Sequence, residues 1–267
     1  RRLTVDRIHN VSPSSQAPTA RRRAFGRGVV SADAVVALVD AKVRDVAVRT
    51  NRDYVTVLLS DNGGNPCAQS LAGSSLPFRG CKMTLFDGGV RVPAAVASSY
   101  FPDGRSGRSY DGLAHHVDWV ATLATAVRTG ARVDAEKARN STACVEASSL
   151  LDARDHWAAL VQNAARGTTE TPVATTPPST SDQDRVLYLS LTRDSCVARS
   201  ERWKLHVNSP NQTWFPLDTR FRDPRYCVPD VATPAVDAVF RAALFEADAD
   251  PTEADDVAAA HEDVVKA

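Results

Sequence analysis

Runs of apolar residues along the chain predict a mixture of helices and strands. Residues 54–59 form an unbroken run of β-branched or large apolar residues, which is typical of a strand buried on both faces. From Val29 to about Arg49, apolar residues recur near helical spacing while charged residues take the other face. Ser31 is placed to cap the start of this helix. The pattern predicts a helix that covers a sheet.

Shorter apolar runs predict further strands. We expect them at residues 92–97, 186–191, 196–199 and 203–207. Residues 167–184 are rich in Thr, Pro and Ser and too polar to be buried, so we interpret them as a loop. The chain therefore divides into residues 1–166, the loop 167–184 and residues 185–267.

Composition narrows the function classes. The 267 residues are enough to bury a large core, and 32 basic and 32 acidic side chains give a formal charge of zero. No overall field favours nucleic acid or an anionic membrane, and no apolar run approaches the length of a membrane span. Because Arg1 is the first residue, without an initiator Met or a leader, we expect a fragment or a mature or truncated product. Oligomeric state is not indicated.

Cysteines and glycosylation sequons bear on the compartment. The five cysteines are widely separated and form no CxxC pair and no Cys/His metal spacing: Cys67, Cys81, Cys144, Cys196 and Cys227. Their odd number leaves at least one thiol unpaired within the chain. Asn10, Asn140 and Asn211 each head a glycosylation sequon. These sequons favour a secretory or lysosomal setting, although such triplets also arise by chance.

The candidate chemistry lies where the 54–59 strand ends. Ser60, Asp61, Asn62, Gly63 and Gly64 follow directly, and in open α/β sheets ligands bind at the carboxyl ends of strands. Adjacent Asp and Asn side chains offer hard oxygen ligands that suit Ca²⁺ or Mg²⁺. The same residues also make an ordinary turn at the end of a strand, and the tetrapeptide alone leaves both interpretations open.

Two further blocks follow this loop, and together the three resemble the sulfatase family, most closely the arylsulfatase B type. They are residues 76–82, LPFRGCK, and residues 84–93, TLFDGGVRVP. The resemblance implies an alkaline-phosphatase-like fold, with a mostly parallel sheet flanked by helices and a small C-terminal antiparallel-sheet-plus-helix subdomain. In this frame residues 1–166 are the C-terminal half of a catalytic domain, and residues 185–267 are the subdomain. The resemblance also implies a helix that starts within residues 113–123 and a C-terminal helix at about residues 253–266.

The resemblance also implies roles for individual residues. Asp61 and Asn62 match a pair of ligands to a divalent cation, Ca²⁺ or Mg²⁺, and Lys82 matches a lysine that binds a sulfate oxygen. A compact ammonium suits this task because it can meet charge on sulfate oxygens. His9 takes the place of a histidine that contacts the substrate, where it could donate a proton. The alternatives are a solvated lysine and a satisfied histidine.

Two other patterns are treated as structural. Residues 75–79, SLPFR, fit the bare S-x-P-x-R motif in which sulfatases form formylglycine, but the Thr-Gly that normally follows is missing and the segment already matches the lysine block. His115 and His116 stand beside Asp118 and could suggest a metal or acid–base site. In the family this element packs behind the site, so we expect Asp118 to cap or fix its turn.

The early half of the family pattern, with an Asp-Asp ligand pair and the formylglycine motif, has no counterpart in the chain. We therefore expect a sulfuric ester hydrolase fragment, acting on a sugar or aryl sulfate ester within a secretory, lysosomal or extracellular setting, that is inactive by itself. Two alternatives are a phosphodiesterase or phosphonate hydrolase of the same superfamily and a non-catalytic pseudo-sulfatase module. The sequence upstream of Arg1 would discriminate among them.

Overall fold

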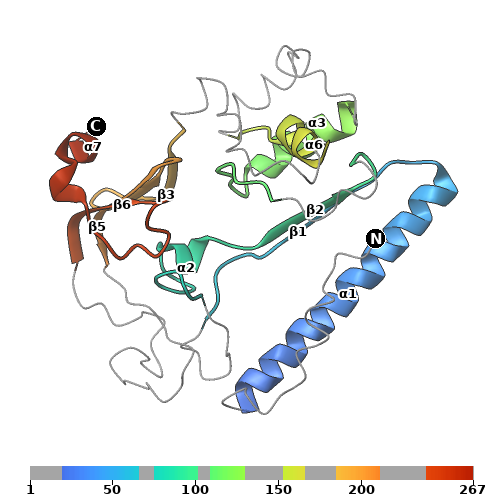
Figure 1. The fold of residues 1–267 in the computed structure, drawn as a ribbon, viewed down its shortest axis with the longest axis horizontal. Helices are drawn as coiled ribbons and strands as arrows, with labels where there is room; N and C mark the ends of the chain where they lie inside the picture. The colour runs from blue at the N-terminus through green and yellow to red at the C-terminus, as the bar shows by residue number, and fades with distance from the viewer. Residues whose placement is uncertain are drawn as a thin grey trace. The chain divides into compact units, whose positions relative to one another are not determined.

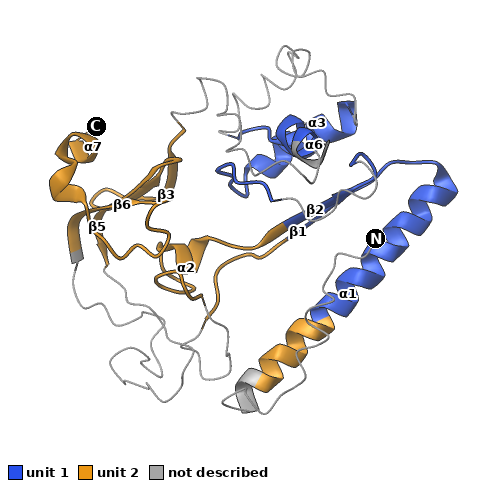
Figure 2. Ribbon diagram, viewed as in Figure 1, with its two compact units in different colours: residues 1–7, 32–58, 95–178 blue, residues 8–31, 59–94, 179–267 orange. Residues whose placement is uncertain are grey.

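The computed structural model describes residues 20–65, 75–101, 109–129, 153–165, 185–210 and 239–266. The chain forms two compact units (Figure 2). Unit 1 comprises residues 1–7, 32–58 and 95–178, and unit 2 comprises residues 8–31, 59–94 and 179–267. The loop predicted at residues 167–184 lies outside the described residues, and the division into residues 1–166 and 185–267 stays a prediction.

The helix predicted from Val29 begins earlier, so that α1 runs from Ala20 to Thr50 (Figure 1). Ser31 is not its N-cap, because its hydroxyl lies inside the helix and donates to the carbonyl oxygen of Arg27 at 3.0 Å. Ion pairs one turn apart, Asp40 with Arg44 at 2.7 Å and Asp45 with Arg49 at 2.9 Å, support the second half of the helix. The N-cap prediction was wrong because the Ala- and Arg-rich residues before Ser31 also favour helix.

Strand β1, Val55–Leu59, pairs with β2, Ala94–Ser98. The pair is antiparallel, since Ser99 N–H donates to the carbonyl of Tyr54 at one end and Ser60 N–H donates to that of Pro93 at the other, both at 3.2 Å. The prediction that β1 is buried on both faces was wrong for the described structure, where its residues are half-buried and Leu58 is 45 % exposed. Two strands alone provide too little apolar surface to cover both faces.

Unit 1 also contains helices α3, Asp118–Thr129, and α6, Trp157–Ala165, which lie side by side (Figure 1). Trp157 is fully buried, with the ring of Phe101 stacked on it at 5.9 Å between centroids and Tyr100 at its edge. Thr122 and Ala126 of α3 are also buried. This aromatic and helical contact forms the described core of unit 1.

Unit 2 is built on a four-stranded antiparallel sheet in the order β3-β4-β5-β6. The strands are Leu187–Leu191, Cys196–Arg199, Trp203–Pro210 and Val239–Glu246. The short helix α2, Asp87–Val90, follows Phe86, and that ring packs with Ala243, Phe245 and Phe240 of β6. Residues 80–90 are thereby held against the sheet by apolar burial.

The predicted C-terminal helix is much shorter than expected. A 3₁₀ turn, η2, spans Ala258–Ala260, and helix α7 spans Glu262–Lys266. The Asp250 carboxylate accepts hydrogen bonds from the backbone N–H groups of Ala254 and Asp255, and Glu253 has a φ of 55°. Residues 250–255 therefore form a turn rather than a helix, because side chains capture the amides that would start the helix.

The structure confirms a mixed α/β protein with an antiparallel sheet and a short helix near the C-terminus. All strand pairs among the described residues are antiparallel. The mostly parallel sheet of the alkaline-phosphatase-like fold therefore stays a prediction. No described helix combines the length and the apolar character required to cross a membrane.

Candidate functional site

A pocket of about 500 Å³ opens in unit 2 where β1 ends. Asp61, Asn62 and Lys82, which the sequence analysis selected, all line it. The other lining residues are Phe25, Ser60, Gly63, Gly64, Asn65, Ser75, Leu76, Phe78, Gly88, Arg91 and Pro93. His9 lies outside the described residues. A carboxylate, a carboxamide and an ammonium therefore share one cavity.

The cation-ligand pair sits in a tight turn. The N–H of Asn62 donates to Oδ1 of Asp61 at 2.9 Å, and the hydroxyl of Ser60 donates to the carbonyl of Asn62 at 2.9 Å. Asp61 is exposed and Asn62 is half-buried. The turn and the ligand interpretation are compatible, since the local bonds fix the backbone while the carboxylate faces solvent.

Backbone hydrogen bonds join this turn to the two segments after it. Gly63 N–H donates to the carbonyl of Gly89, and Lys82 N–H donates to the carbonyl of Gly64, each at 2.8 Å. A Cβ atom on Gly63 would overlap the carbonyl oxygen of Gly88, so only glycine allows this approach. The three sequence blocks that define the resemblance are therefore hydrogen-bonded into one structure.

The turn that carries Lys82 is firmly held. Cys81 is buried, its N–H donates to Oγ1 of Thr84 at 3.1 Å, and Thr84 N–H donates back to the carbonyl of Cys81 at 3.0 Å. Gly80 and Met83, on either side, both have positive φ values, 75° and 76°. Lys82 itself is half-buried at the pocket wall, so its backbone is fixed while its amine can meet a ligand.

Arg91 is a second cation at the pocket that the sequence analysis did not select. Its guanidinium lies 4.8 Å from the ring centroid of Phe78 and 3.5 Å from Oδ2 of Asp87, and its side chain is 53 % exposed. The GG-x-R block contained this residue, but spacing alone did not reveal that its side chain reaches the pocket. The wall of the pocket thus carries two basic groups.

The S-x-P-x-R residues do not act together. Ser75 lines the pocket, and its hydroxyl is buried without a hydrogen-bond partner in the described part of the chain. Arg79 is not among the lining residues, because its guanidinium donates to the carbonyl of Glu253 at 2.7 Å and lies 4.7 Å from the ring centroid of Phe86. Arg79 supports the interior of unit 2.

In unit 1, the carboxylate of Asp118, near His115 and His116, has a structural role. Asp118 is 2 % exposed and accepts hydrogen bonds from the N–H groups of His115 at 2.7 Å and Arg154 at 2.8 Å. Its Oδ2 also lies 3.1 Å from Nε2 of His156, which the sequence analysis did not select. Asp118 therefore fixes the turn before α3, as expected.

A divalent cation would find only part of its ligand shell in the described residues. Ca²⁺ takes six to eight oxygens, of which Asp61 and Asn62 supply a few. Within the described ranges no three His, Cys, Asp or Glu side chains are grouped so as to hold a metal ion. The donor type fits a hard cation, while the donor count requires further oxygen ligands.

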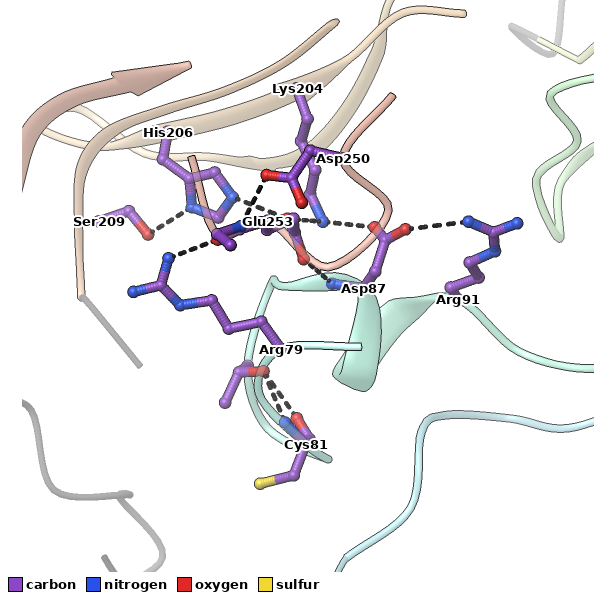
Figure 3. A network of polar contacts seen from close by, with 11 residues as sticks. Arg79, Cys81, Asp87, Arg91, Lys204, His206, Ser209, Asp250 and Glu253 are labelled. Atoms are coloured by element: carbon purple, nitrogen blue, oxygen red, sulfur yellow. Dashed lines mark hydrogen bonds and ion pairs between the residues drawn. The ribbon is translucent and has the colours of Figure 1, made fainter. Parts of the chain in front are cut away.

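Asp87, next in sequence to the lining residue Gly88, belongs to a buried ionic group made of Lys204, Asp87 and Glu253, here named the Lys204 cluster (Figure 3). Nζ of Lys204 lies 2.7 Å from Oδ1 of Asp87 and 2.8 Å from Oε1 of Glu253, and the lysine is 1 % exposed. Glu253 also accepts the backbone N–H of Asp87 through Oε2, at 2.6 Å. Burial raises the pKa of Asp87, but the charge and hydrogen bond of Lys204, together with the charges of Arg199 and Arg91, outweigh burial and hold that pKa below its ordinary value.

Comparisons with known proteins agree with part of this interpretation. No family model matches the chain. Arylsulfatase J from Mus musculus is 32 % identical over 95 residues, which is 34 % of this chain and 15 % of that protein. A solved structure titled "Crystal structure of Ps i-CgsB" superposes with a TM-score of 0.53 at 19 % identity, over 92 % of this chain and 41 % of the other. The first likeness relates a segment of the chain to a sulfatase, and the second concerns the fold alone.

Proposed function

We propose that this chain is the later portion of a sulfatase, a sulfuric ester hydrolase, and that its pocket binds a divalent cation and the sulfate group of a substrate. The observation that carries the proposal is the pocket of about 500 Å³ that Asp61, Asn62 and Lys82 line together. The similarity of 95 residues to arylsulfatase J supports it. The chain spans only 15 % of that relative, so the activity of a whole protein is part of the proposal.

Each lining group has a task in sulfate ester hydrolysis. Asp61 and Asn62 would hold Ca²⁺ or Mg²⁺, which polarises a sulfate oxygen when bound. Lys82 would pair with another sulfate oxygen and stabilise charge that develops there. His9, if it reaches the same pocket, would protonate the leaving alcohol. The nucleophile, formylglycine, would come from a preceding segment of the same fold.

The proposed fold is alkaline-phosphatase-like. In that architecture β1 ends at a site loop, and residues 60–64 do follow β1 directly and line the pocket. The superposition on 41 % of a larger solved structure is compatible with a partial domain. The secretory, lysosomal or extracellular location and glycosylation are proposals from the resemblance and from three sequons, which lie outside the described residues.

Cation binding tests the proposal directly. Calorimetric titration of the purified chain with CaCl₂ should show binding that Asp61→Asn weakens by about tenfold, since Ca²⁺ affinity depends on the number of anionic ligands and one of them is lost. Asp111→Asn, which removes an exposed carboxylate that does not line the pocket, is the matched control. Equal Ca²⁺ affinity for Asp61→Asn and the unaltered chain would refute the cation site.

A turnover assay tests the fragment interpretation. The purified chain should release no alcohol from an aryl sulfate, because the complete formylglycine motif and the Asp-Asp ligand pair of the sulfatase pattern have no counterpart in its sequence. Measurable turnover that Lys82→Met abolishes would show that the chain is complete in itself and would contradict this part of the proposal.

A non-catalytic binding module is the second candidate. The observation in its favour is that no group of three or more metal-ligating side chains occurs in the described part of the chain. A longer natural product that contains this chain separates the two candidates. A sulfatase would acquire turnover with the preceding segment, whereas a binding module would bind the sulfate ester without cleaving it.

A further inference from the structure

The Lys204 cluster is connected to the pocket through a short series of backbone contacts. Glu253 binds the N–H of Asp87, which is the first residue of α2, and Lys204 binds its carboxylate. Two residues later, the carbonyl of Gly89 accepts the N–H of Gly63, immediately after the proposed cation ligands. Asp87 is therefore bound by Glu253 and Lys204, while Gly89 of the same helix is hydrogen-bonded to the loop that contains Asp61 and Asn62.

The segment that leads to Lys82 is attached to the same cluster through Arg79. Arg79 donates to the carbonyl of Glu253 at 2.7 Å, and its own carbonyl accepts the N–H of Gly88 at 2.7 Å. Lys82 lies three residues after Arg79, and its N–H is bonded to Gly64. Figure 3 shows Arg79 and Asp87 pointing toward Glu253 and Lys204, while Arg91 meets Asp87 from the other side.

None of these contacts tolerates much displacement. Gly63, Gly88 and Gly89 have no room for a Cβ atom, because each meets backbone oxygen of a neighbouring segment. Lys204, Glu253 and His206 are at most 2 % exposed, so the surrounding packing holds their positions. Breaking a buried ion pair by removal of one partner leaves an uncompensated charge, which forces the remaining groups to move.

We propose that Lys204 and Glu253 are positioning residues of the pocket, and that their buried contacts with Asp87 set the position of the Asp61–Gly63 loop and of Lys82. This inference rests on the proposed function for what the pocket binds. Neither residue lines the pocket, so each acts through Asp87 and the backbone of residues 79–89. The C-terminal sheet thereby becomes part of the binding apparatus rather than a separate support.

Amide hydrogen exchange of the full chain tests the connection without any ligand. In Lys204→Met, the Gly63 and Lys82 amides should exchange about tenfold faster or more, as expected when a local unit opens more readily. Amides in the β3–β4 ladder should keep their rates. Arg202→Met is the control, because it removes an exposed ion pair with Glu246 beside the same strand. Unchanged rates at Gly63 and Lys82, or equal acceleration of the β3–β4 amides, would overturn the proposal.

Glu253 provides a second pair of variants that also covers the case in which Lys204→Met does not fold. The Gln in Glu253→Gln keeps a carbonyl oxygen that can accept from Asp87 N–H, whereas Glu253→Leu removes the acceptor. Protection of Gly63 and Lys82 should be largely retained in Glu253→Gln and lost in Glu253→Leu. Equal protection in these two folded variants would count against the proposal.

Calcium titration of the same variants connects positioning to binding. The affinity for Ca²⁺ should fall about tenfold or more in Lys204→Met, the range found when outer contacts of metal ligands are removed. An unchanged Ca²⁺ affinity in folded Lys204→Met would overturn the proposal. If the unaltered chain binds no Ca²⁺, the proposed function fails, while the amide exchange result still decides whether Lys204 positions the loop.

Discussion

The imidazole of His206 is stacked on the ring of Phe86, with 4.5 Å between ring centroids and no exposed surface. Its Nδ1 lies 3.1 Å from the hydroxyl of Ser209, and its Nε2 lies 3.7 Å from Oε1 of Glu253. The stack joins β5 to the residue before α2. A histidine thus occupies the centre of the apolar core that supports the pocket segment.

This burial predicts a pH dependence of stability. Burial, together with the nearby charges of Lys204 and Arg79, holds the pKa of His206 below its usual value of 6.5, although Glu253 opposes the shift. The unfolded chain therefore binds the proton at a higher pH than the folded chain. As pH falls below 6.5 the free energy of unfolding should decrease, by at most about 1.4 kcal/mol per pH unit for one group.

Urea denaturation at pH 7 and pH 5 measures this effect. In His206→Phe, which keeps an aromatic ring for the stack, the difference between the two pH values should shrink, while in His116→Gln, which alters an exposed histidine, it should stay. Asp87 should not contribute to the difference between pH 7 and pH 5. Its pKa is lowered in the folded chain, so the stability that its charge provides is lost only in more acidic solution. An undiminished difference in folded His206→Phe would contradict the prediction.

The glycine at position 63 should be irreplaceable. In Gly63→Ala the new Cβ would overlap the carbonyl of Gly88, so the loop or α2 must move. We expect a loss of about 2 kcal/mol or more in the free energy of unfolding, in the range typical of strained backbone sites. Denaturant titration with Gly26→Ala as the control measures it. Gly26 lies in α1 with open space around it, so its substitution should stabilise the chain by up to about 1 kcal/mol.

The sequence predicted those parts of the site that depend on neighbours along the chain. The apolar run located β1 to within one residue, and the Asp-Asn-Gly-Gly sequence located the turn, because both depend on local backbone preferences. The strand at Cys196–Arg199 was predicted with its observed bounds. The grouping of Asp61, Asn62 and Lys82 was suggested by the family resemblance, and the roles of these residues stay predictions.

Contacts between distant segments were not predictable in this way. Lys204 and Asp87 are 117 positions apart, and nothing in the local sequence distinguishes Lys204 from a solvated lysine on a strand. Glu253 was expected at the start of a helix, because the family resemblance implies a C-terminal helix from about residue 253. It instead turns inward with a positive φ, since the buried Lys204 and the N–H of Asp87 bind its carboxylate.

Asp118 should be important for the stability of unit 1 rather than for binding. Its carboxylate accepts two backbone N–H groups and contacts His156 while almost fully buried. Asp118→Asn keeps the shape but replaces one acceptor oxygen by a donor, which should cost about 1–3 kcal/mol in the free energy of unfolding. Asp45→Asn, on the exposed face of α1, should cost under about 1 kcal/mol. Thermal and urea denaturation of the two variants compare them, and equal losses would contradict the structural role.

Lys82 and Arg91 should divide the binding of an oxyanion unequally. Both line the pocket, but Arg91 is already engaged by Asp87 and Phe78, whereas Lys82 follows a buried turn that fixes its backbone. In the presence of Ca²⁺, calorimetric titration with sulfate should give about tenfold or more weaker binding for Lys82→Met, since a hydrogen bond to a charged group contributes about 1.5–3 kcal/mol. Arg91→Met should weaken binding less, and Lys42→Met, on the surface of α1, should not change it. Binding of sulfate that weakens equally in all three variants would indicate general charge attraction, and the pocket would then have no specific role for Lys82.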